Sequence, residues 1–406
     1  MGIHTHCCSS DSAVLIPAGH RSYLQRMRRP QIKSVYPPIP VGDGIIRIGG
    51  VDYGSAAEIT DDSEGNTWRL LNLLDGTRTV ADVIAVFHHH NPTVAPEDIV
   101  AAIDALDQGG YLEDAAAAPK AGVFSAAEMQ RYHRNFGFFS YFHMPPLNQY
   151  DLQSRLKHAR VTLLGLGGLG SFVALSLASV GVGDILIVDH DTVELSNLNR
   201  QVLYTAADLG TSKCDAAAHK LAEVNPHVRV SARHLKINSI DDARSCMAGR
   251  DILICAADRP RIRLYEWLNT AAMAEDVAWI RGANDGLTVN LFMHVPGRTA
   301  CFECEQIGAA AEHPWYPRFI DYAMHGIGDR TVNPCTAPVA GLIGNLAALE
   351  VVKFLTGIET PVIYGSKLVL DLRSMETRFH PGERQDSCAS CASYRQHRLA
   401  SNSAVA

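Results

Sequence analysis

Short apolar segments alternate with longer helical patterns through the middle of the chain. Residues 161–164, 184–189 and 251–257 are rich in Val, Ile and Leu and are bounded by turn residues, which predicts buried strands. Residues 171–180 are apolar on almost every side, so we expect a buried helix between the first two strands. Strands separated by helices predict an α/β fold of Rossmann type with a mostly parallel sheet.

The front of the chain has a different pattern. Apolar residues at 45–48 and 51–59 flank a Gly-Gly pair, which predicts a β-hairpin. Thr79 and Asp82 have the spacing of a capping box at the start of a helix. Three helices are expected, over residues 66–74, 79–88 and 96–108. A hairpin with three short helices predicts a small α+β domain of winged-helix-like layout.

Composition sets the expected boundaries between these parts. Residues 115–124 are rich in Ala, Gly and Pro and predict a linker, and residues 125–136 predict a helix after it. The first 35 residues are polar and rich in turn formers, so we expect a partly ordered arm. The expected segments are an arm at 1–35, a winged-helix-like domain at 36–114, the linker at 115–124, an α/β domain at 125–395 and a tail at 396–406.

Charge and hydropathy exclude several classes of partner. The formal net charge is −7, no long basic run occurs, and acidic residues outnumber basic ones within 36–114, so no nucleic-acid partner is expected. No stretch of about 18 residues is apolar and free of charges and turn formers, which argues against a membrane span. The N-terminal residues lack the basic and apolar regions of a signal peptide, so we expect a cytoplasmic protein.

A glycine-rich turn follows the first predicted strand. The run from Gly165 through Gly167 and Gly168 to Gly170 predicts a strand, a turn and a helix whose backbone passes close to a bound phosphate. Asp189 closes the next strand 24 residues after Gly165, where a carboxylate can accept hydrogen bonds from a ribose. This pattern alone fits NAD, FAD and ATP sites equally well.

The residues beyond Asp189 favour ATP. An NAD site needs no cations gathered on phosphates, whereas adenylyl transfer needs cations beside the α-phosphate and a carboxylate that holds Mg²⁺. The required residue types follow in order as Asp191, Asn197, Arg200, Gln201, Lys213 and Asp258. No Gly-x-x-x-x-Gly-Lys-Ser/Thr sequence occurs, so the predicted site is not a P-loop.

Four of the ten cysteines form two Cys-x-x-Cys pairs. The pairs are Cys301 with Cys304 and Cys388 with Cys391. Two such pairs can supply a tetrahedral thiolate site for Zn²⁺, which would be structural because four protein ligands leave no open position. A redox-active pair is the alternative, but it would need a thioredoxin-like context that the sequence lacks.

Taken together, these motifs resemble the adenylation domain of the E1-like (ubiquitin-activating-type) enzymes, whose bacterial members include ThiF and MoeB. The sequence GLGGLG is followed by VDHDTVELSNLNRQ, GTSK and AAD, and the segment from Cys335 to Gly357 is similar to the closing helix of the family. The resemblance covers about residues 130–395. It implies that a carboxylate attacks the α-phosphate of Mg-ATP, which gives an acyl adenylate and pyrophosphate.

The same resemblance implies roles for single residues. Asp189 would bind the ribose, and Asp258 would hold Mg²⁺. The phosphate contacts would come from Asn197, Arg200 and Lys213. Members also use an arginine from the partner subunit of a homodimer, and Arg134 is the match here, although Asn135 replaces the usual Gln and Arg131 is a near competitor. Bacterial members carry the same two Cys-x-x-Cys pairs, which implies structural zinc.

The front domain resembles a second kind of module. Its hairpin, its three helices and the sequence LDGTRTV around Asp75 are similar to PqqD-like elements. Those elements bind the leader of a ribosomally made precursor peptide as an added strand at the hairpin edge. A small packing or dimerisation domain is the alternative. In layout, a recognition element fused to an E1-like domain resembles the enzymes of microcin C7 maturation and, more closely, of pantocin A maturation.

The combined resemblance leads to a hypothesis of function. We expect ATP-dependent adenylation of a glutamate side chain in a precursor peptide, followed by dehydrative ring closure of the pantocin A type. Transfer of AMP to the peptide, as in microcin C7 biosynthesis, is one alternative. Another is a sulfur-carrier adenylyltransferase of the ThiF or MoeB kind, which would need Cys335 but not residues 36–114. A non-catalytic, leader-presenting partner in an azole-forming complex is the third.

Residues 305–333 are rich in aromatic residues, histidine and glycine. By resemblance, this segment is the crossover loop of the E1-like enzymes, so we expect a mobile lid or a wall that binds peptide. Cys335 follows it directly, where relatives also place a cysteine. It is therefore either a small buried residue or a nucleophile that takes over the acyl group.

Overall fold

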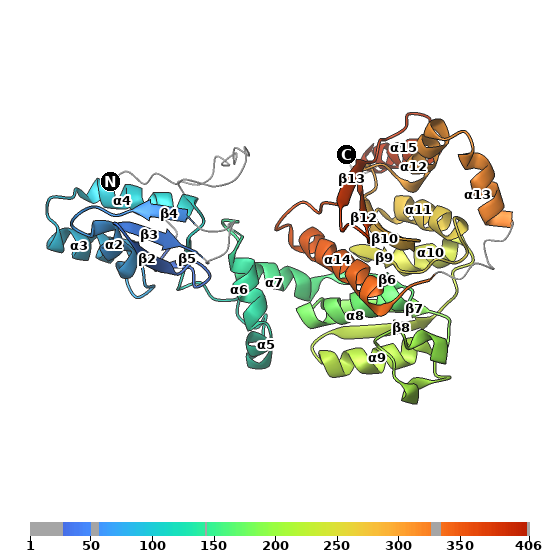
Figure 1. Ribbon diagram of the computed structural model, residues 1–406, viewed down its shortest axis with the longest axis horizontal. Helices are drawn as coiled ribbons and strands as arrows, with labels where there is room; N and C mark the ends of the chain where they lie inside the picture. The colour runs from blue at the N-terminus through green and yellow to red at the C-terminus, as the bar shows by residue number, and fades with distance from the viewer. Residues whose placement is uncertain (1–26, 50–56, 143, 326–333, 404–406) are drawn as a thin grey trace. The chain divides into compact units, whose positions relative to one another are not determined.

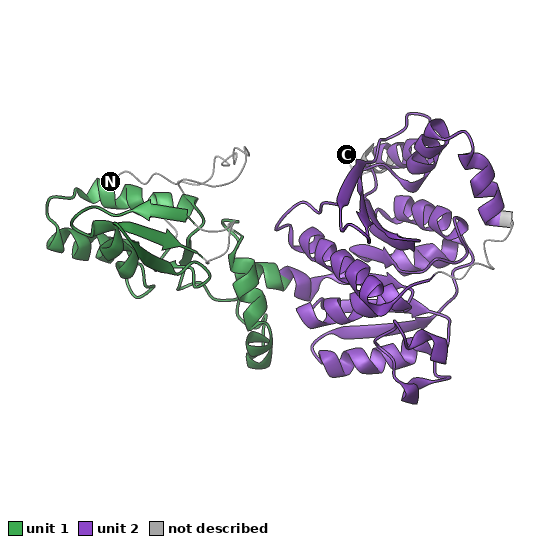
Figure 2. Ribbon diagram, in the orientation of Figure 1, with its two compact units in different colours: residues 1–154 green, residues 155–406 purple. Residues whose placement is uncertain are grey.

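A computed structural model describes residues 27–49, 57–142, 144–325 and 334–403. The chain divides into two compact units, residues 1–154 and 155–406, which Figure 2 distinguishes by colour. This division falls later than the expected boundary at residue 125. Residues 125–154 belong to the front unit, where the ring of Tyr36 packs edge-on against Tyr141 at a centroid distance of 5.6 Å.

The front unit contains two antiparallel sheets. The strands are β1 (Pro30–Ile32) paired with β5 (Leu112–Asp114), and β2 (Pro38–Gly42), β3 (Ile45–Ile48) and β4 (Ala57–Thr60) in that order. The expected hairpin is present as β3 and β4, although residues 50–56 lie outside the described residues. The sequence pattern missed β2, because Pro38 and Pro40 are atypical of strands and are tolerated at a sheet edge. Strand β1 lies within the expected arm, so the unit begins before residue 36.

Three helices complete the core of the front unit. They are α2 (Asn66–Leu73), α3 (Val80–His90) and α4 (Pro96–Gln108). The expected capping box is present, since the Thr79 side chain accepts from the Asp82 N–H and Asp82 accepts from the Thr79 N–H. The apolar faces of these helices pack on β3 and β4 around Phe87 and Ile103, both fully buried. The helix expected over 125–136 is instead two helices, α5 (Ala126–Arg131) and α6 (His133–Ser140), separated at Tyr132.

The second unit is built on one eight-stranded sheet (Figure 1). The order is β13-β12-β11-β10-β9-β6-β7-β8; the strands from β10 to β8 are parallel, and β11, β12 and β13 are antiparallel. The strands are β6 (Arg160–Leu164), β7 (Asp184–Asp189), β8 (Arg229–His234), β9 (Ile252–Cys255), β10 (Ala278–Asp285), β11 (Thr288–His294), β12 (Ser366–Asp371) and β13 (Thr377–Pro381). The mostly parallel sheet confirms the predicted α/β class. Three of its strands were expected from the sequence, β6, β7 and β9, whereas β8 and β10 to β13 were not. Strand β8 is a largely exposed edge strand whose residues lack an apolar run.

Helices cover both faces of this sheet (Figure 1). The helices of this unit are α8 (Gly168–Val180), α9 (Lys213–Val224), α10 (Ile240–Met247), α11 (Arg263–Glu275), α12 (Phe302–Glu312), α13 (Tyr316–His325), α14 (Ala337–Thr356) and α15 (Ala389–Ser403), with short 3-10 turns η1 (Leu195–Asn197) and η2 (Ala206–Asp208). Helix α7 (Gln149–His158) contains the boundary between the two units. Helices α8 and α14 lie side by side. Among the described helices, α14 is long and apolar enough to cross a bilayer, but 56% of its most apolar stretch is buried inside the protein.

The chain order creates a crevice at one edge of the sheet. Strands β6 and β9 are neighbours, but β6 leads to β7 on one side and β9 leads to β10 on the other. Connections that diverge in this way leave an opening at the carboxyl ends of the two strands, where open α/β sheets bind ligands.

Candidate active site

A cavity of about 710 Å³ occupies this crevice. It is lined from the carboxyl ends of β6, β7, β9 and β10, the loops that follow them and the start of α14. The predicted residues that line it are Gly165, Gly167, Gly168, Asp189, Asp191, Asn197, Arg200, Gln201, Lys213 and Asp258. Residues scattered over almost a hundred positions of the sequence therefore share one pocket.

The glycine turn forms one wall of the pocket. Gly165 has a φ of 94°, and a Cβ added there would come within 2.7 Å of the Ala257 backbone nitrogen. Gly167 precedes α8, whose first N–H groups have no partner within the helix and can bind an anion. Gly170 does not line the pocket; a Cβ there would lie 2.0 Å from the Gly165 carbonyl oxygen, so this glycine permits close packing of helix on strand.

Asp189 organises the backbone around the pocket. Its Oδ2 accepts from the Leu166 N–H at 2.7 Å, which ties the glycine turn to the end of β7. Its Oδ1 accepts from the N–H groups of His190 and Asp191 at 2.7 and 2.9 Å. Asp189 is buried, and its carboxylate still lines the cavity at the end of a strand, the position from which such residues accept ribose hydroxyl groups.

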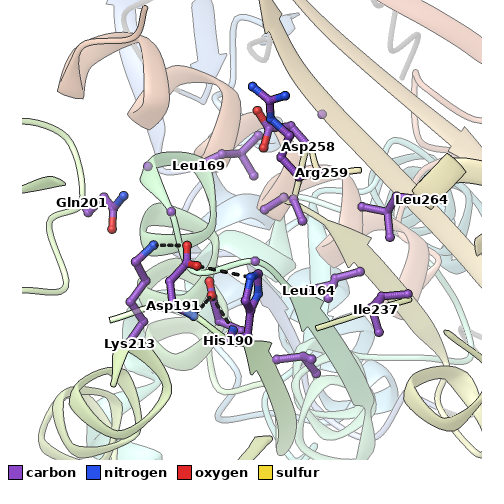
Figure 3. A pocket seen from close by; sticks show the side chains of 18 of the residues that line it. Leu164, Leu169, His190, Asp191, Gln201, Lys213, Ile237, Asp258, Arg259 and Leu264 are labelled. Carbon is purple, nitrogen blue, oxygen red and sulfur yellow. Dashed lines mark hydrogen bonds and ion pairs between the residues drawn. The ribbon is translucent and has the colours of Figure 1, made fainter. Parts of the chain in front are cut away.

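Lys213 is a buried cation held by Asp191. Its Nζ lies 2.8 Å from Oδ2 of Asp191, and its side chain is only 7% exposed (Figure 3). Burial alone would raise the pKa of Asp191, but the hydrogen bond and charge of Lys213 lower it overall. Asp191 therefore stays ionised at neutral pH and holds the Lys213 side chain at the pocket wall.

The turn that carries Asn197 and Arg200 forms a second wall. The Asn197 Oδ1 accepts from the Glu194 N–H at 3.1 Å, so this buried amide shapes the turn as well as lining the pocket. Arg200 donates to the Ser196 carbonyl at 3.0 Å. Gln201 is buried, and its Oε1 accepts no hydrogen bond in the described structure, which leaves an acceptor beside the pocket.

Asp258 lies at the end of β9, in a different part of the pocket from Lys213 (Figure 3). It is exposed, and within the described ranges its carboxylate takes part in no hydrogen bond or ion pair. A free carboxylate in a pocket that Arg200 and Lys213 also line is suited to hold a divalent metal bound to phosphates.

Several residues of the pocket were not predicted. They are His190, residues 235–238 after β8, Arg259, Leu264, residues 282–284 at the end of β10, and Ala340 and Ile343 of α14. Recognition of β8 would have pointed to 235–238, because the loop after each parallel strand opens on the same crevice. The residues of β10 and α14 have no sequence signal of this kind.

Cys335 also lines the pocket, half-buried beside the start of α14. Burial raises the pKa of its thiol, and the nearby charge of Arg200 opposes that shift only in part. The thiol is thus near the nucleotide site but is mostly protonated at neutral pH.

The four paired cysteines come together away from this pocket. The Sγ atoms lie 3.8 Å apart for Cys301 and Cys304, 3.4 Å for Cys301 and Cys388, and 3.6 Å for Cys304 and Cys391. Tetrahedral zinc with Zn–S bonds of about 2.3 Å requires S···S separations of about 3.8 Å, so the buried cluster fits this ion. The cluster joins the start of α12 to the start of α15.

Arg134 is placed in the front unit, at the start of α6, and is exposed. The expected role of this residue in a partner subunit remains a prediction.

The comparisons with known proteins agree with this geometry. The sequence matches the ThiF family over residues 142–390. It is 30% identical to the sulfur carrier protein ThiS adenylyltransferase of Escherichia coli, covering 59% of this chain and 89% of that protein. It is also 30% identical to the molybdopterin-synthase adenylyltransferase of the same organism, covering 64% and 96%.

Two solved structures are similar over most of the chain. E. coli MccB, solved with AMPCPP and MccA, has a TM-score of 0.71 at 22% identity and covers 89% of this chain and 99% of its own. PaaA has a TM-score of 0.68 at 25% identity and covers 87% and 100%. The match over residues 142–390, together with relatives covered almost to their full length, places this chain in the ThiF family of E1-like, ATP-dependent adenylating enzymes.

Proposed function

We propose that this enzyme adenylates a carboxylate on a ribosomally made precursor peptide. The observation that carries the proposal is the meeting of a glycine turn, two cations and a free carboxylate in one pocket. The glycine turn suits the phosphates, and Arg200 and Lys213 suit the charge that develops on the α-phosphate. Asp258 would hold Mg²⁺, which neutralises phosphate charge when bound.

The proposed reaction has two steps. A carboxylate oxygen of the peptide attacks the α-phosphorus of ATP, and the bond to the bridging oxygen of pyrophosphate breaks. A nucleophile then attacks the carbonyl carbon of the acyl adenylate, and AMP leaves. The protein contributes by holding the triphosphate in line and by stabilising the negative charge on the oxygens around phosphorus.

The front unit supports a peptide as the substrate. In the described residues, β4 is the edge of its three-stranded sheet and pairs only with β3, so its other edge can accept a peptide as a fourth strand. MccB, which is similar in fold over 89% of this chain, has been solved with N-formylated MccA. An N-formyl group marks a polypeptide that keeps its initiating residue, as a ribosomally made precursor does. We therefore assign leader binding to residues 36–114 and the reaction to the cytoplasm, which supplies ATP and new peptide.

Coverage of the relatives argues against a sulfur carrier as the substrate. The two E. coli sulfur-pathway enzymes are matched over 89% and 96% of their own length, yet they account for only 59% and 64% of this chain. More than a third of the chain therefore has no counterpart in them. MccB and PaaA have counterparts for most of that remainder.

We further propose that the activated group is a glutamate side chain and that an internal nucleophile closes a ring with loss of water. The similarity to PaaA, at 25% identity over 87% of this chain, supports the pantocin A type of maturation. A product that carries AMP would point to the microcin C7 type.

A homodimer would complete the site. Three large apolar side chains close in sequence to Asn197 and Arg200 are exposed: Leu195 by 74%, Val202 by 43% and Leu209 by 42%. Isolated apolar residues need no explanation, but a group beside an active site favours a covering partner. We propose that a second copy covers them and supplies Arg134 to the α-phosphate.

We also propose that the Cys301, Cys304, Cys388 and Cys391 cluster binds structural Zn²⁺. Burial raises the pKa of the Cys301 and Cys388 thiols, so a bound cation is needed to hold the set as thiolates.

The test is pyrophosphate release from ATP in the presence of a glutamate-containing precursor peptide, with intact-mass analysis of the peptide. The proposal predicts release that depends on the peptide, and a product lighter by one water. A chain that charges a carrier protein ending in Gly-Gly, and ignores the peptide, would contradict it.

A further inference from the structure

A second group of charges lies next to the nucleotide pocket. Arg281 of β10 donates from Nη2 to Oε2 of Glu305 at 2.6 Å. Its guanidinium group also lies over the rings of Tyr265 and Phe302, 5.6 and 5.4 Å from their centroids. The ion pair and the two rings hold the guanidinium group in one position.

Two nitrogen donors of this group have no acceptor in the described structure. The Nε of Arg281 is buried and makes no hydrogen bond. Lys367 of β12 is half-buried, and no described carboxylate lies within ion-pair distance of its Nζ. Burial lowers the pKa of Lys367, and the charge of Arg281 lowers it further. A cation in such surroundings is costly unless an anion pairs with it.

The sheet register puts these two side chains on the same face. Gly282 pairs with Leu291 of β11, and Leu291 pairs with Leu368 of β12. Gly282 and Leu368 are therefore aligned across β11. Arg281 and Lys367 directly precede these two residues, and β10 and β12 run in the same direction, so Arg281 and Lys367 are aligned as well. Their backbones are therefore two strands, or about 10 Å, apart, a gap that two long side chains can close around a small anion.

The carboxylates already present do not fill this gap. Glu305 is engaged by Arg281, and its charge acts on Lys367 only through space, opposing the fall in the pKa of Lys367. Asp285 acts on Lys367 only through space and is exposed at the end of β10. Lys367, which is half-buried, therefore remains available to an acidic group from outside.

The charge group adjoins the reaction site. Residues 282–284, which follow Arg281 on β10, line the nucleotide pocket, as does Leu264 beside Tyr265. Tyr265 lies within range of the charges of both Arg281 and Asp258. Tyr265 and Arg281 thus connect the part of the pocket around Asp258 with Lys367.

We propose that Lys367, with Arg281 behind it, binds a second carboxylate of the peptide substrate, one that does not react. The inference rests on the proposed peptide-adenylating function and names the substrate class: a peptide with an acidic group close to the activated one. Lys367 is a specificity-determining residue in this account, because it does not contact the reacting phosphorus.

The first experiment measures ligand binding at Lys367 without turnover. The full-length protein is treated with limiting acetic anhydride, and acetylation of each lysine is quantified by mass spectrometry. The probes are N-acetyl-Glu-Glu methylamide, its Glu-Gln isostere, and glutarate. We expect the diacidic peptide to reduce acetylation of Lys367 severalfold, and the isostere and glutarate to reduce it little. Acetylation of Lys220 on α9 should not change with any of the three probes. The proposal would be overturned if either the isostere or glutarate reduced acetylation of Lys367 as much as the diacidic peptide does.

The second experiment measures ATP–pyrophosphate exchange with the two peptides. Lys367→Met should raise the KM for the diacidic peptide by about ten- to a hundredfold, the range expected for one charge-assisted hydrogen bond, with kcat changed less than about twofold. The KM for the isostere should not change, Lys367→Arg should restore much of the binding, and Lys220→Met should resemble the wild type. An unchanged KM for the diacidic peptide would overturn the proposal. Absence of exchange by the wild type would count against the proposed function, while the acetylation assay still tests Lys367.

Discussion

The ammonium group of Lys213 lies 2.8 Å from the carboxylate of Asp191, and the backbone N–H of Lys213 donates to the Asp191 carbonyl at 3.0 Å. The lysine is therefore held by its backbone and by its charged end before any nucleotide binds. A cation fixed in this way needs little reorganisation when charge develops on a phosphate.

Replacement of Lys213 should stop adenylation. Lys213→Met removes the cation and leaves the Asp191 carboxylate unpaired beside the triphosphate, so exchange activity should fall by about a hundredfold or more. The double variant with Asp191→Asn should recover about tenfold of that loss, because the repulsive charge is gone. Lys220→Met, on the same helix but paired with Glu223 at the surface, is the matched control and should remain within about twofold of wild type. Full activity of Lys213→Met would contradict the assigned role.

The expected role of Arg134 predicts complementation between inactive variants. Arg134→Ala and Asp258→Ala should each be inactive alone, with the fold unchanged. After subunit exchange, each mixed dimer contains one site with an intact Asp258 and an intact partner arginine. Random mixing should therefore restore about a quarter of wild-type exchange activity, since about half the dimers are mixed and each has one working site. A mixture as inactive as its components would show that Arg134 does not act across a dimer.

The cysteine cluster predicts a metal that stabilises the fold without taking part in the reaction. Cys304→Ser should abolish bound zinc and lower the Tm by on the order of 10 °C, because three buried thiols remain without their cation. Metal content is measured by mass spectrometry and the Tm by calorimetry. Cys335→Ser is the control, since this residue lies in the nucleotide pocket, and its zinc content should equal that of wild type. Loss of zinc in both variants would contradict the assignment.

A buried histidine predicts that stability falls in mild acid. His294 stacks on Trp279 at 4.6 Å, and its Nδ1 lies 3.1 Å from the Ala300 carbonyl oxygen. Burial lowers the pKa of His294 to about 4 from 6.5, although Glu305 opposes this. Between pH 4 and pH 6.5, His294 is protonated in the unfolded chain but neutral in the folded protein. The free energy of unfolding therefore decreases as pH falls from about 6.5 towards 4.

From pH 7.5 to pH 5 this histidine should account for about 2 kcal/mol of lost stability. Urea unfolding at the two pH values measures the loss. His294→Gln should reduce the pH dependence by that amount even if it is less stable overall, whereas His227→Gln, at an exposed position, should not. A wild-type pH dependence in His294→Gln would show that another group is responsible.

Local chemistry explains which parts were predictable from the sequence. Helix α4 has the predicted bounds because Pro96 is compatible with a first helical turn and Gly109 follows the last residue. The pocket residues of β6, β7 and β9 were predictable because parallel strands bring their carboxyl ends to one edge. Strand β2 contains prolines and β8 is a largely exposed edge strand, so neither has the pattern of a buried strand.

The remaining features depend on tertiary structure. Cys335 was noted in the sequence, but its place in the nucleotide pocket follows from how α14 packs beside α8. Arg281 and Lys367 are 86 residues apart in sequence and share a sheet face only through the register of β10, β11 and β12. No local pattern marks such a pair.

The most direct test of the central claim follows the oxygen atom that attacks phosphorus. A glutamate-containing precursor peptide with ¹⁸O in its side-chain carboxylates is incubated with the enzyme and Mg-ATP, and the released nucleotide is analysed by mass spectrometry. Because the carboxylate oxygen becomes bonded to the α-phosphorus and leaves with it, the account predicts AMP that carries one ¹⁸O atom. Unlabelled AMP, or release of ADP and phosphate in its place, would contradict it.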